Sequence, residues 1–106
     1  MAKFLIIASY TSEGAKGLLK DGGSKRREVV TEAVKALGGT VEAFYYAFGD
    51  ADAYAAVDFP DNISAAAISL AINAAGSVSV KLVVLMTPEE IDAATQKIVE
   101  YTAPGQ

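Results

Sequence analysis

The 106-residue sequence contains no cysteine and no histidine. Without cysteine the chain can form no disulfide, no thiolate nucleophile and no cysteine-ligated metal site. Without histidine it lacks imidazole acid–base catalysis, histidine-ligated metals and a proximal ligand for haem. We therefore expect neither a metal nor another cofactor in this protein.

Long apolar runs and positive charge are also scarce. The apolar stretch near the N-terminus, residues 4–8, is too short for a signal peptide, and no run approaches the roughly 18 apolar residues of a membrane span. The net charge of −4 argues against nucleic acid as a partner, because proteins that bind it carry an excess of Lys and Arg. The sequence predicts a cytoplasmic protein that binds neither membranes nor nucleic acid.

Apolar residues, in contrast, are abundant. The sequence is 52% hydrophobic and 21% charged, which predicts one packed domain over residues 1–106. A domain of this size buries only about 60–65% of the surface of its unfolded chain. So large an apolar share therefore suggests further burial in an oligomer.

Four segments show the alternation of β-strands. They are residues 3–10, 40–48, 51–59 and 77–86. The first is apolar on both faces, which predicts a central strand that is covered on both sides. The short connection at residues 49–50 joins the second and third strands as a hairpin, and Pro60 ends the third strand. By strict alternation, Val41, Ala43 and Tyr45 share one face of the second strand.

Three helices are predicted over residues 25–37, 62–75 and 88–101. Ser24 is expected to cap the first and Asp61 the second. Thr87 and Glu90 are placed to form a capping box for the third. Residues 11–23 contain four glycines and are predicted to form a loop or a short helical turn.

This order predicts an α+β fold, a ferredoxin-like βαββαβ antiparallel sheet with an extra C-terminal helix. Helices on one face of such a sheet leave the other face open. The open face would include Leu5, Ile7, Tyr54, Val83 and Leu85, and it is too apolar to remain in water. We expect it to pack against the same face of a second copy, in a C₂ homodimer or a higher homo-oligomer.

Six short segments spread over nearly the whole chain resemble a known family. They are YTSEG (10–14), KRR (25–27), LGG (37–39), FYYAFGDAD (44–52), PD (60–61) and LMTPEE (85–90). In combination they are similar to the GYD domain family, a group of uncharacterised proteins. The resemblance implies a dimeric α/β barrel and no particular activity. Gly49 and Asp52 match the Gly, Tyr, Asp signature of the family, but Ala51 stands where its tyrosine is expected.

Aromatic and acidic residues gather at the hairpin and near the end of the first strand. Tyr10, Tyr46 and Tyr54 offer hydroxyls, and Asp52 or Asp50 offers a carboxylate, so the group is a candidate ligand-binding site. Such a site would lie at the edge of a cavity formed when two chains pair. Alternatively, the aspartates fix the turn through side-chain hydrogen bonds and the aromatics fill the core.

A second candidate is an anion site at the predicted start of the first helix, formed by Ser24, Lys25, Arg26 and Arg27. Free N–H groups at a helix start, next to guanidinium groups, can hold a phosphate or a carboxylate. The alternative is a solvated basic helix start.

The third candidate combines charges on strands. Lys81 with Asp58 or Glu42 would form a lysine–carboxylate pair in a cleft, where burial lowers the pKa of a lysine. The alternative is that these charges lie at strand ends and reach water.

Two functions remain open from the sequence. One is a non-enzymatic domain for small-molecule binding or assembly, formed as a homo-oligomer. The other is a cofactor-free oxygenase or isomerase that acts on a small organic substrate in the barrel cavity, and this rests on analogy between folds.

Overall fold

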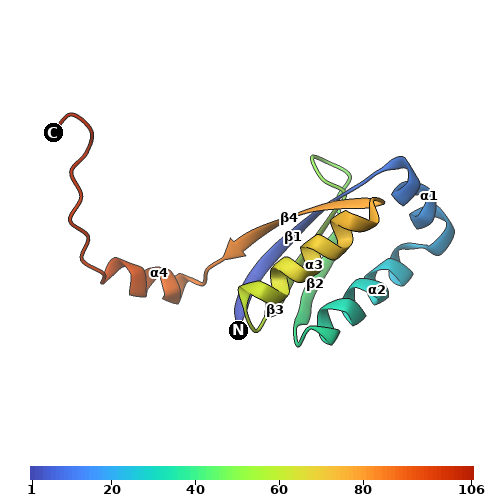
Figure 1. Cartoon of the computed structure of the whole chain (residues 1–106), viewed down its shortest axis with the longest axis horizontal. Helices are drawn as coiled ribbons and strands as arrows, with labels where there is room; N and C mark the ends of the chain where they lie inside the picture. Colours follow the sequence, from blue (N-terminus) through green and yellow to red (C-terminus); the bar gives the residue numbers. More distant parts are fainter.

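A computed structural model describes residues 1–106. Helices and strands follow one another along the chain as shown in Figure 1. They are β1 (Ala2–Tyr10), α1 (Ser12–Asp21), α2 (Gly23–Ala36), β2 (Thr40–Tyr46), β3 (Ala53–Phe59), α3 (Asn62–Ala75), β4 (Val78–Leu85) and α4 (Pro88–Thr95). No helix is both long enough and apolar enough to cross a membrane.

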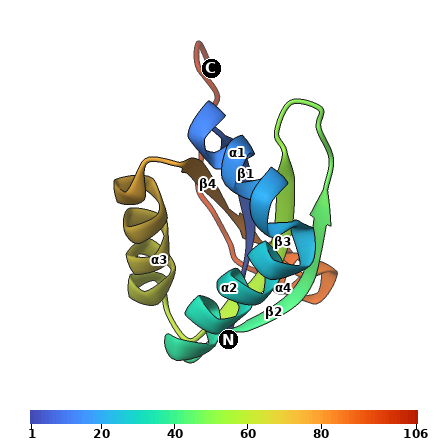
Figure 2. The same cartoon turned by 90° about the vertical axis from the view of Figure 1, so that its right-hand side faces the viewer.

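The four strands form one antiparallel sheet in the order β2-β3-β1-β4. This confirms the predicted α+β class and is compatible with a ferredoxin-like arrangement. Helices α2 and α3 lie on the same face of the sheet (Figure 2). Strand β1 is central, as expected, but helices cover only one of its faces. Phe4 and Ile6 are buried there, whereas Leu5 and Ile7 on the open face stay partly exposed.

Residues 12–21 form helix α1, where the sequence predicted a loop or a short turn. The Thr11 hydroxyl caps this helix by accepting a hydrogen bond from the Gly14 N–H at 3.2 Å. A Cβ at Gly14 would collide with the Ser77 carbonyl group. The glycine that suggested a loop therefore allows α1 to pack closely against the start of β4.

Helix α2 begins at Gly23, so the prediction that Ser24 caps it is wrong. Gly22 is both the last cap of α1 and the N-cap of α2, with a φ of 84° that favours glycine. The chain turns directly from one helix into the next, and Ser24 falls inside the first turn.

The caps of the other two helices are confirmed. Asp61 accepts a hydrogen bond from the Ser64 N–H at 2.8 Å, and Thr87 with Glu90 forms the capping box of α4. Helix α4 ends at Thr95, however, and not at residue 101. The residues that follow include the β-branched Ile98 and Val99, and they have no neighbouring surface to stabilise a helix.

The β2–β3 hairpin is confirmed, but a bulge between Val41 and Ala43 changes its faces. Val41 then lies on the helix-covered face together with Phe44 and Tyr46, and Ala43 lies on the open face with Tyr45. Strict alternation, which placed Val41, Ala43 and Tyr45 on one face, is therefore wrong at this point. A bulge adds one residue to a strand and reverses the alternation beyond it.

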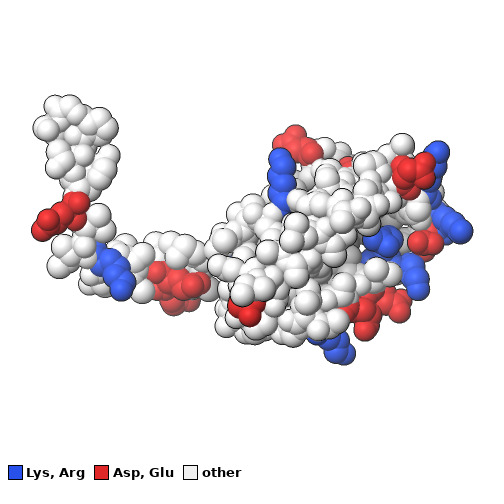
Figure 3. Space-filling model, viewed as in Figure 1, with Lys and Arg blue, Asp and Glu red and all other residues white.

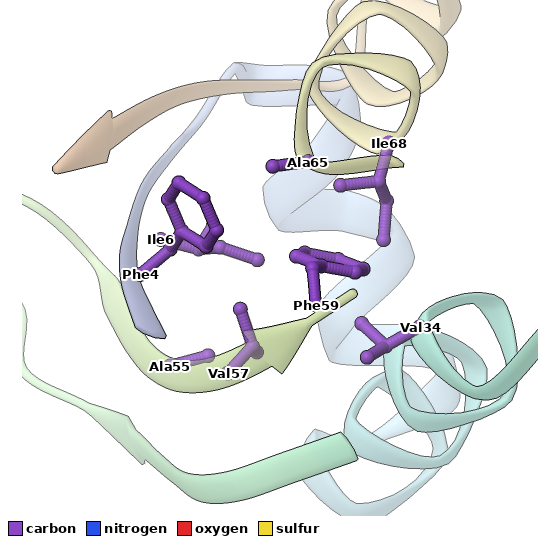
Figure 4. Close-up of a cluster of buried hydrophobic side chains, with 8 residues drawn as sticks. All are labelled: Phe4, Ile6, Val34, Ala55, Val57, Phe59, Ala65 and Ile68. Carbon is purple, nitrogen blue, oxygen red and sulfur yellow. The ribbon is translucent and has the colours of Figure 1, made fainter. Parts of the chain in front are cut away.

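The core lies between the helix-covered face of the sheet and helices α2 and α3 (Figure 4). Its buried cluster contains Phe4, Ile6, Val34, Ala55, Val57, Phe59, Ala65 and Ile68. Side chains become smaller along both central strands in the same direction. Paired positions run from Phe4–Val57 through Ile6–Ala55 to Ala8–Ala53. Large side chains therefore fill one end of this layer, and alanines line the other.

The C-terminal arm, defined as residues 86–106, extends away from the rest of the molecule (Figure 1). Every residue from 88 to 106 is exposed. The radius of gyration is 16.9 Å, against about 13 Å for a compact chain of this length.

Candidate ligand-binding site

An apolar cavity lies at the alanine-lined end of the layer between the sheet and helices α2 and α3. Its volume of about 90 Å³ is several times the roughly 10–15 Å³ that one water molecule needs. Of its 14 lining residues, 13 are hydrophobic. They include Ala8, Ala53 and Ala55 from the two central strands, whose small side chains leave this space open. An apolar cavity with few polar groups is typical of small-molecule sites.

Arg26 is the only charged residue that lines this cavity. It lies in the first turn of α2 and is partly buried. Its guanidinium group forms no ion pair, since the ion pairs of this chain involve only Lys3 and Lys16. A partly desolvated guanidinium group without a carboxylate is suited to an anionic group of a ligand.

Tyr46 lies beside this cavity and joins the hairpin to α2. Its hydroxyl donates a hydrogen bond to the Gly23 carbonyl oxygen at 3.1 Å. A Cβ at Gly23 would lie only 3.0 Å from the Tyr46 ring, so the glycine leaves room for this close approach. The ring also packs edge-on against Phe44 and stacks on Phe48, with ring centres 5.3 and 6.2 Å away.

Burial of its hydroxyl, and then the neighbouring Tyr10 hydroxyl, raise the pKa of Tyr46 to about 12. The positive charges of Arg26 and Arg27 act in the opposite direction but do not prevail. Tyr46 is therefore protonated at neutral pH. It can donate a hydrogen bond, but it cannot serve as a base there.

Tyr10 and Asp52 lie at the same end of the sheet as Tyr46. Tyr10 lines the cavity. The Asp52 carboxylate accepts a hydrogen bond from the Tyr10 backbone N–H at 2.7 Å. The Asp52 backbone N–H also donates to the Ala8 carbonyl oxygen at 2.8 Å. Asp52 thus ties the hairpin loop to the end of β1 through a hydrogen bond between residues distant in sequence, and not through the local turn bond of the structural alternative.

Tyr54 lies on the opposite, open face of the sheet. It lines a shallow groove of about 310 Å³ together with Ser9, Asp50, Ala51 and Lys81. Of the four hairpin candidates, Tyr10, Tyr46 and Asp52 therefore come together, and the sheet separates Tyr54 from them. The bulge in β2 causes this separation, because it moves Tyr46 to the helix-covered face.

The four residues of the predicted anion site also separate. Ser24 and Lys25 are exposed, and Arg27 is exposed beside the edge strand β2. Only Arg26 lines the cavity. The other three residues of the group do not line it.

The third predicted constellation contains a different lysine. Lys3, which the sequence did not single out, pairs with Glu42 and, at 3.0 Å, with the Asp58 carboxylate. Hydrogen bonds to Glu42 and then to Asp58 raise the pKa of Lys3. Lys81 lies apart from this group, on β4 opposite Ile7 of β1. No three acidic side chains come close enough together to form a candidate metal site.

Comparison with protein families matches residues 4–95 to the GYD domain. The chain belongs to the GYD domain family. Comparisons with curated proteins and with solved structures gave no match.

Ala51, which stands where the family signature has a tyrosine, lies at the open face of the sheet. Ala51 is 4% exposed and lines the open-face groove beside Tyr54. The hydroxyl that a tyrosine would supply at this position is therefore absent from the groove. Asp52, which matches the aspartate of the signature, joins the loop to β1.

Reasoning from the sequence missed the cavity itself. The signal was present in the third strand, where Ala53 and Ala55 precede Val57 and Phe59 on the same face. Such a gradient of side-chain size indicates unequal filling of the layer above the strand. This gradient did not identify Arg26 as the residue of the basic group that lines the cavity.

Proposed function

We propose that this GYD-family protein is a homodimeric binding domain for a small, largely apolar molecule that carries an anionic group. The ligand would occupy the cavity between the sheet and helices α2 and α3. The observation that carries this proposal is Arg26, a guanidinium group without an ion-pair partner in an otherwise apolar lining.

Binding accounts for the cavity better than catalysis does. An oxygenase or isomerase that abstracts a proton needs a base within hydrogen-bonding reach of its substrate. The cavity lining contains no carboxylate, and the pKa of about 12 keeps the nearby Tyr46 protonated. Arg26 is a donor suited to holding an anion, whereas the Tyr46 O–H already donates to the Gly23 carbonyl oxygen.

The homodimer is the second part of the proposal and is supported by the open face of the sheet. This face carries Leu5, Ile7, Tyr45, Val83 and Leu85, and Tyr45 and Val83 are 72% and 41% exposed. Contiguous exposed apolar surface of this kind marks an interaction site. A face that packs against its own copy about a twofold axis would cover it in both chains.

A matched pair of probes tests ligand binding. Benzoate and benzyl alcohol are similar in size, and only benzoate is anionic. We expect benzoate to shift the NMR signals of cavity residues such as Ala55 and Ile72 and to bind more tightly than benzyl alcohol. Arg26→Gln should weaken benzoate binding about 10- to 100-fold, the effect of losing a charged hydrogen bond of about 1.5–3 kcal/mol.

Arg27→Gln is the control, because Arg27 is the next residue along α2 and does not line the cavity. It should leave the affinity for benzoate unchanged. Equal affinities for the two probes, or equal losses in the two variants, would reject an anion-binding role for Arg26.

A further inference from the structure

The C-terminal arm lacks a packing surface on its own chain. Ile98, Val99 and Tyr101 are 96%, 77% and 76% exposed. Helix α4 has eight residues, fewer than the roughly 12–15 that an isolated helix needs to be even marginally stable in water. An exposed apolar segment with a well-capped helix is therefore expected to pack on another surface.

We propose that this arm docks on the α1–α2 end of a second copy of the chain, in a reciprocal exchange. The inference rests on the proposed homodimer and adds to it the segment that each copy contributes to the other.

Charge on the arm is mostly negative. Between residues 87 and 106 it carries four acidic residues and one basic residue. Glu89 and Asp92 are exposed on α4 and form no ion pair. Glu90 is different, since its side chain closes the capping box.

The α1–α2 end of the molecule has the opposite charge. Residues 12–27 contain five basic and two acidic residues. Lys20, Lys25 and Arg27 are exposed and pair with no carboxylate. Lys and Arg side chains lie over α1 and α2 at one end of the molecule, with Asp and Glu side chains among them, and the arm extends from the other end (Figure 3). The acidic arm and the basic end lie at opposite ends of the same molecule. Between two chains, the arm of one copy is complementary in charge to the α1–α2 end of the other.

The position of the arm determines how the two copies must lie. The arm leaves the sheet at the C-terminal end of β4, and α1 packs at the N-terminal end of the same strand, where the Thr11 hydroxyl donates to the Ser77 carbonyl oxygen. If the twofold axis lies between the two sheets and is perpendicular to the strands, the strands of one copy run opposite to the same strands of the other. Each arm then lies next to the α1–α2 end of the other copy.

The size of the sheet face also favours an added contact. Four strands about 4.8 Å apart, each about 26 Å long, give a flat face of about 500 Å². Stable interfaces bury about 800 Å² of accessible surface on each partner, and an exchanged arm would add to the area that the sheet face buries.

Cross-linking tests the exchange in the full-length protein. Because the chain has no cysteine, an introduced cysteine is its only thiol. We would mix a Thr95→Cys variant with a Lys20→Cys variant and add a short bismaleimide. The proposal expects a cross-linked pair at twice the 11.0 kDa chain mass, enriched at least fivefold over the same experiment with Lys35→Cys. Lys35 is exposed at the far end of α2 and is the matched control.

A chain that carries both Thr95→Cys and Lys20→Cys separates exchange from folding back. A cross-link that forms only within this chain, at monomer mass, would mean that the arm packs on its own body and would overturn the proposal. A monomeric wild-type protein in light scattering would overturn it as well.

Charge reversal provides a second test. Glu89→Lys with Asp92→Lys should weaken dimerisation about 3- to 10-fold, and Lys20→Glu with Lys25→Glu should do the same, as expected for exposed ion pairs. A mixture of the two double variants should restore the affinity between unlike chains. No recovery in the mixture would contradict the pairing of these surfaces.

These tests also separate this inference from the proposed function. If benzoate binds through Arg26 and the dimer forms, but the arm does not cross-link between chains, only the arm exchange fails. If the arm cross-links between chains and benzoate does not bind, ligand binding fails and the exchange stands.

Discussion

The single hydrogen bond from Tyr46 to the carbonyl of Gly23 links the hairpin to helix α2. The glycine at position 23 leaves room for the ring, since a Cβ there would be in tight contact with it. The same contact buries the tyrosine hydroxyl, and burial is the main cause of its raised pKa. The packing of Tyr46 against α2 therefore affects the titration of its own hydroxyl, which can be measured.

This titration predicts how stability depends on pH. The pKa of Tyr46 rises from 10.0 to about 12 on folding, so the folded chain keeps this proton more tightly than the unfolded chain. The stabilisation is complete below pH 10 and is lost as the pH rises toward 12. Urea unfolding should therefore show a falling free energy of unfolding over this range. The fall should be smaller in Tyr46→Phe than in the wild type.

Tyr45→Phe is the matched control for this measurement, because Tyr45 is adjacent in sequence and 72% exposed. It should retain the pH dependence of the wild type. If Tyr46→Phe retained it too, the raised pKa of Tyr46 could not be its source.

Asp52 allows a second test at the scale of one residue. Asp52→Ala removes the acceptor of the Tyr10 N–H bond and leaves that group unpaired. The free energy of unfolding should fall by about 1–3 kcal/mol. Asp50→Ala, in the same loop, removes an exposed carboxylate that accepts no hydrogen bond and should change it by less than about 0.5 kcal/mol. Similar losses in both variants would show that the hydrogen bond to Tyr10 does not stabilise the loop.

At the scale of elements, strands β1 and β3 shape the cavity together. Their paired side chains shrink from Phe4 and Val57 to Ala8 and Ala53, and α2 and α3 bridge the space above them. The gradient of side-chain size along one strand does not by itself create a cavity. The cavity exists because the antiparallel register places the small residues of both strands side by side.

Filling the cavity with a larger side chain should raise the stability of the fold while it weakens ligand binding. Ala55→Val adds two methyl groups toward the cavity and should raise the free energy of unfolding by about 0.5–2 kcal/mol. It should also weaken benzoate binding. Ala56→Val, the next residue on the same strand, points to the open face and should leave benzoate binding unchanged. If Ala55→Val destabilised the chain as overpacking does, this end of the layer would already be filled.

For the whole molecule, the central property is that the sheet has one covered face and one apolar open face. Light scattering should give twice the 11.0 kDa chain mass for the wild type. Val83→Lys places a charge on the open face, at a position paired with Leu5, and should yield the monomer. A charge at the centre of this face would be buried without a partner and would therefore oppose dimerisation.

Leu70→Lys is the control for the dimer. Leu70 is 71% exposed on α3, on the covered side of the sheet, and its replacement should leave the mass unchanged. If both variants remained dimeric, the interface would not include the open face at Val83.

The sequence alone determined those features that depend on neighbouring residues. The caps by Asp61 and Thr87 were predictable because an N-cap bonds within its own first turn. The open face was predictable on β1, β3 and β4 because regular alternation holds there. The family was predictable from short sequence segments, which can be recognised without knowing how the chain packs.

Only the tertiary structure decided the site. The bulge in β2 reversed the alternation and separated Tyr46 from Tyr54, and no local pattern announces such a bulge. Gly14 lies inside a helix and leaves room for the carbonyl group of Ser77, which is distant in sequence. The choice of Arg26 over its basic neighbours depends on how α2 packs over the sheet. Cavities and ion pairs join residues far apart in the chain, so the packing of the elements fixes them and local preference does not.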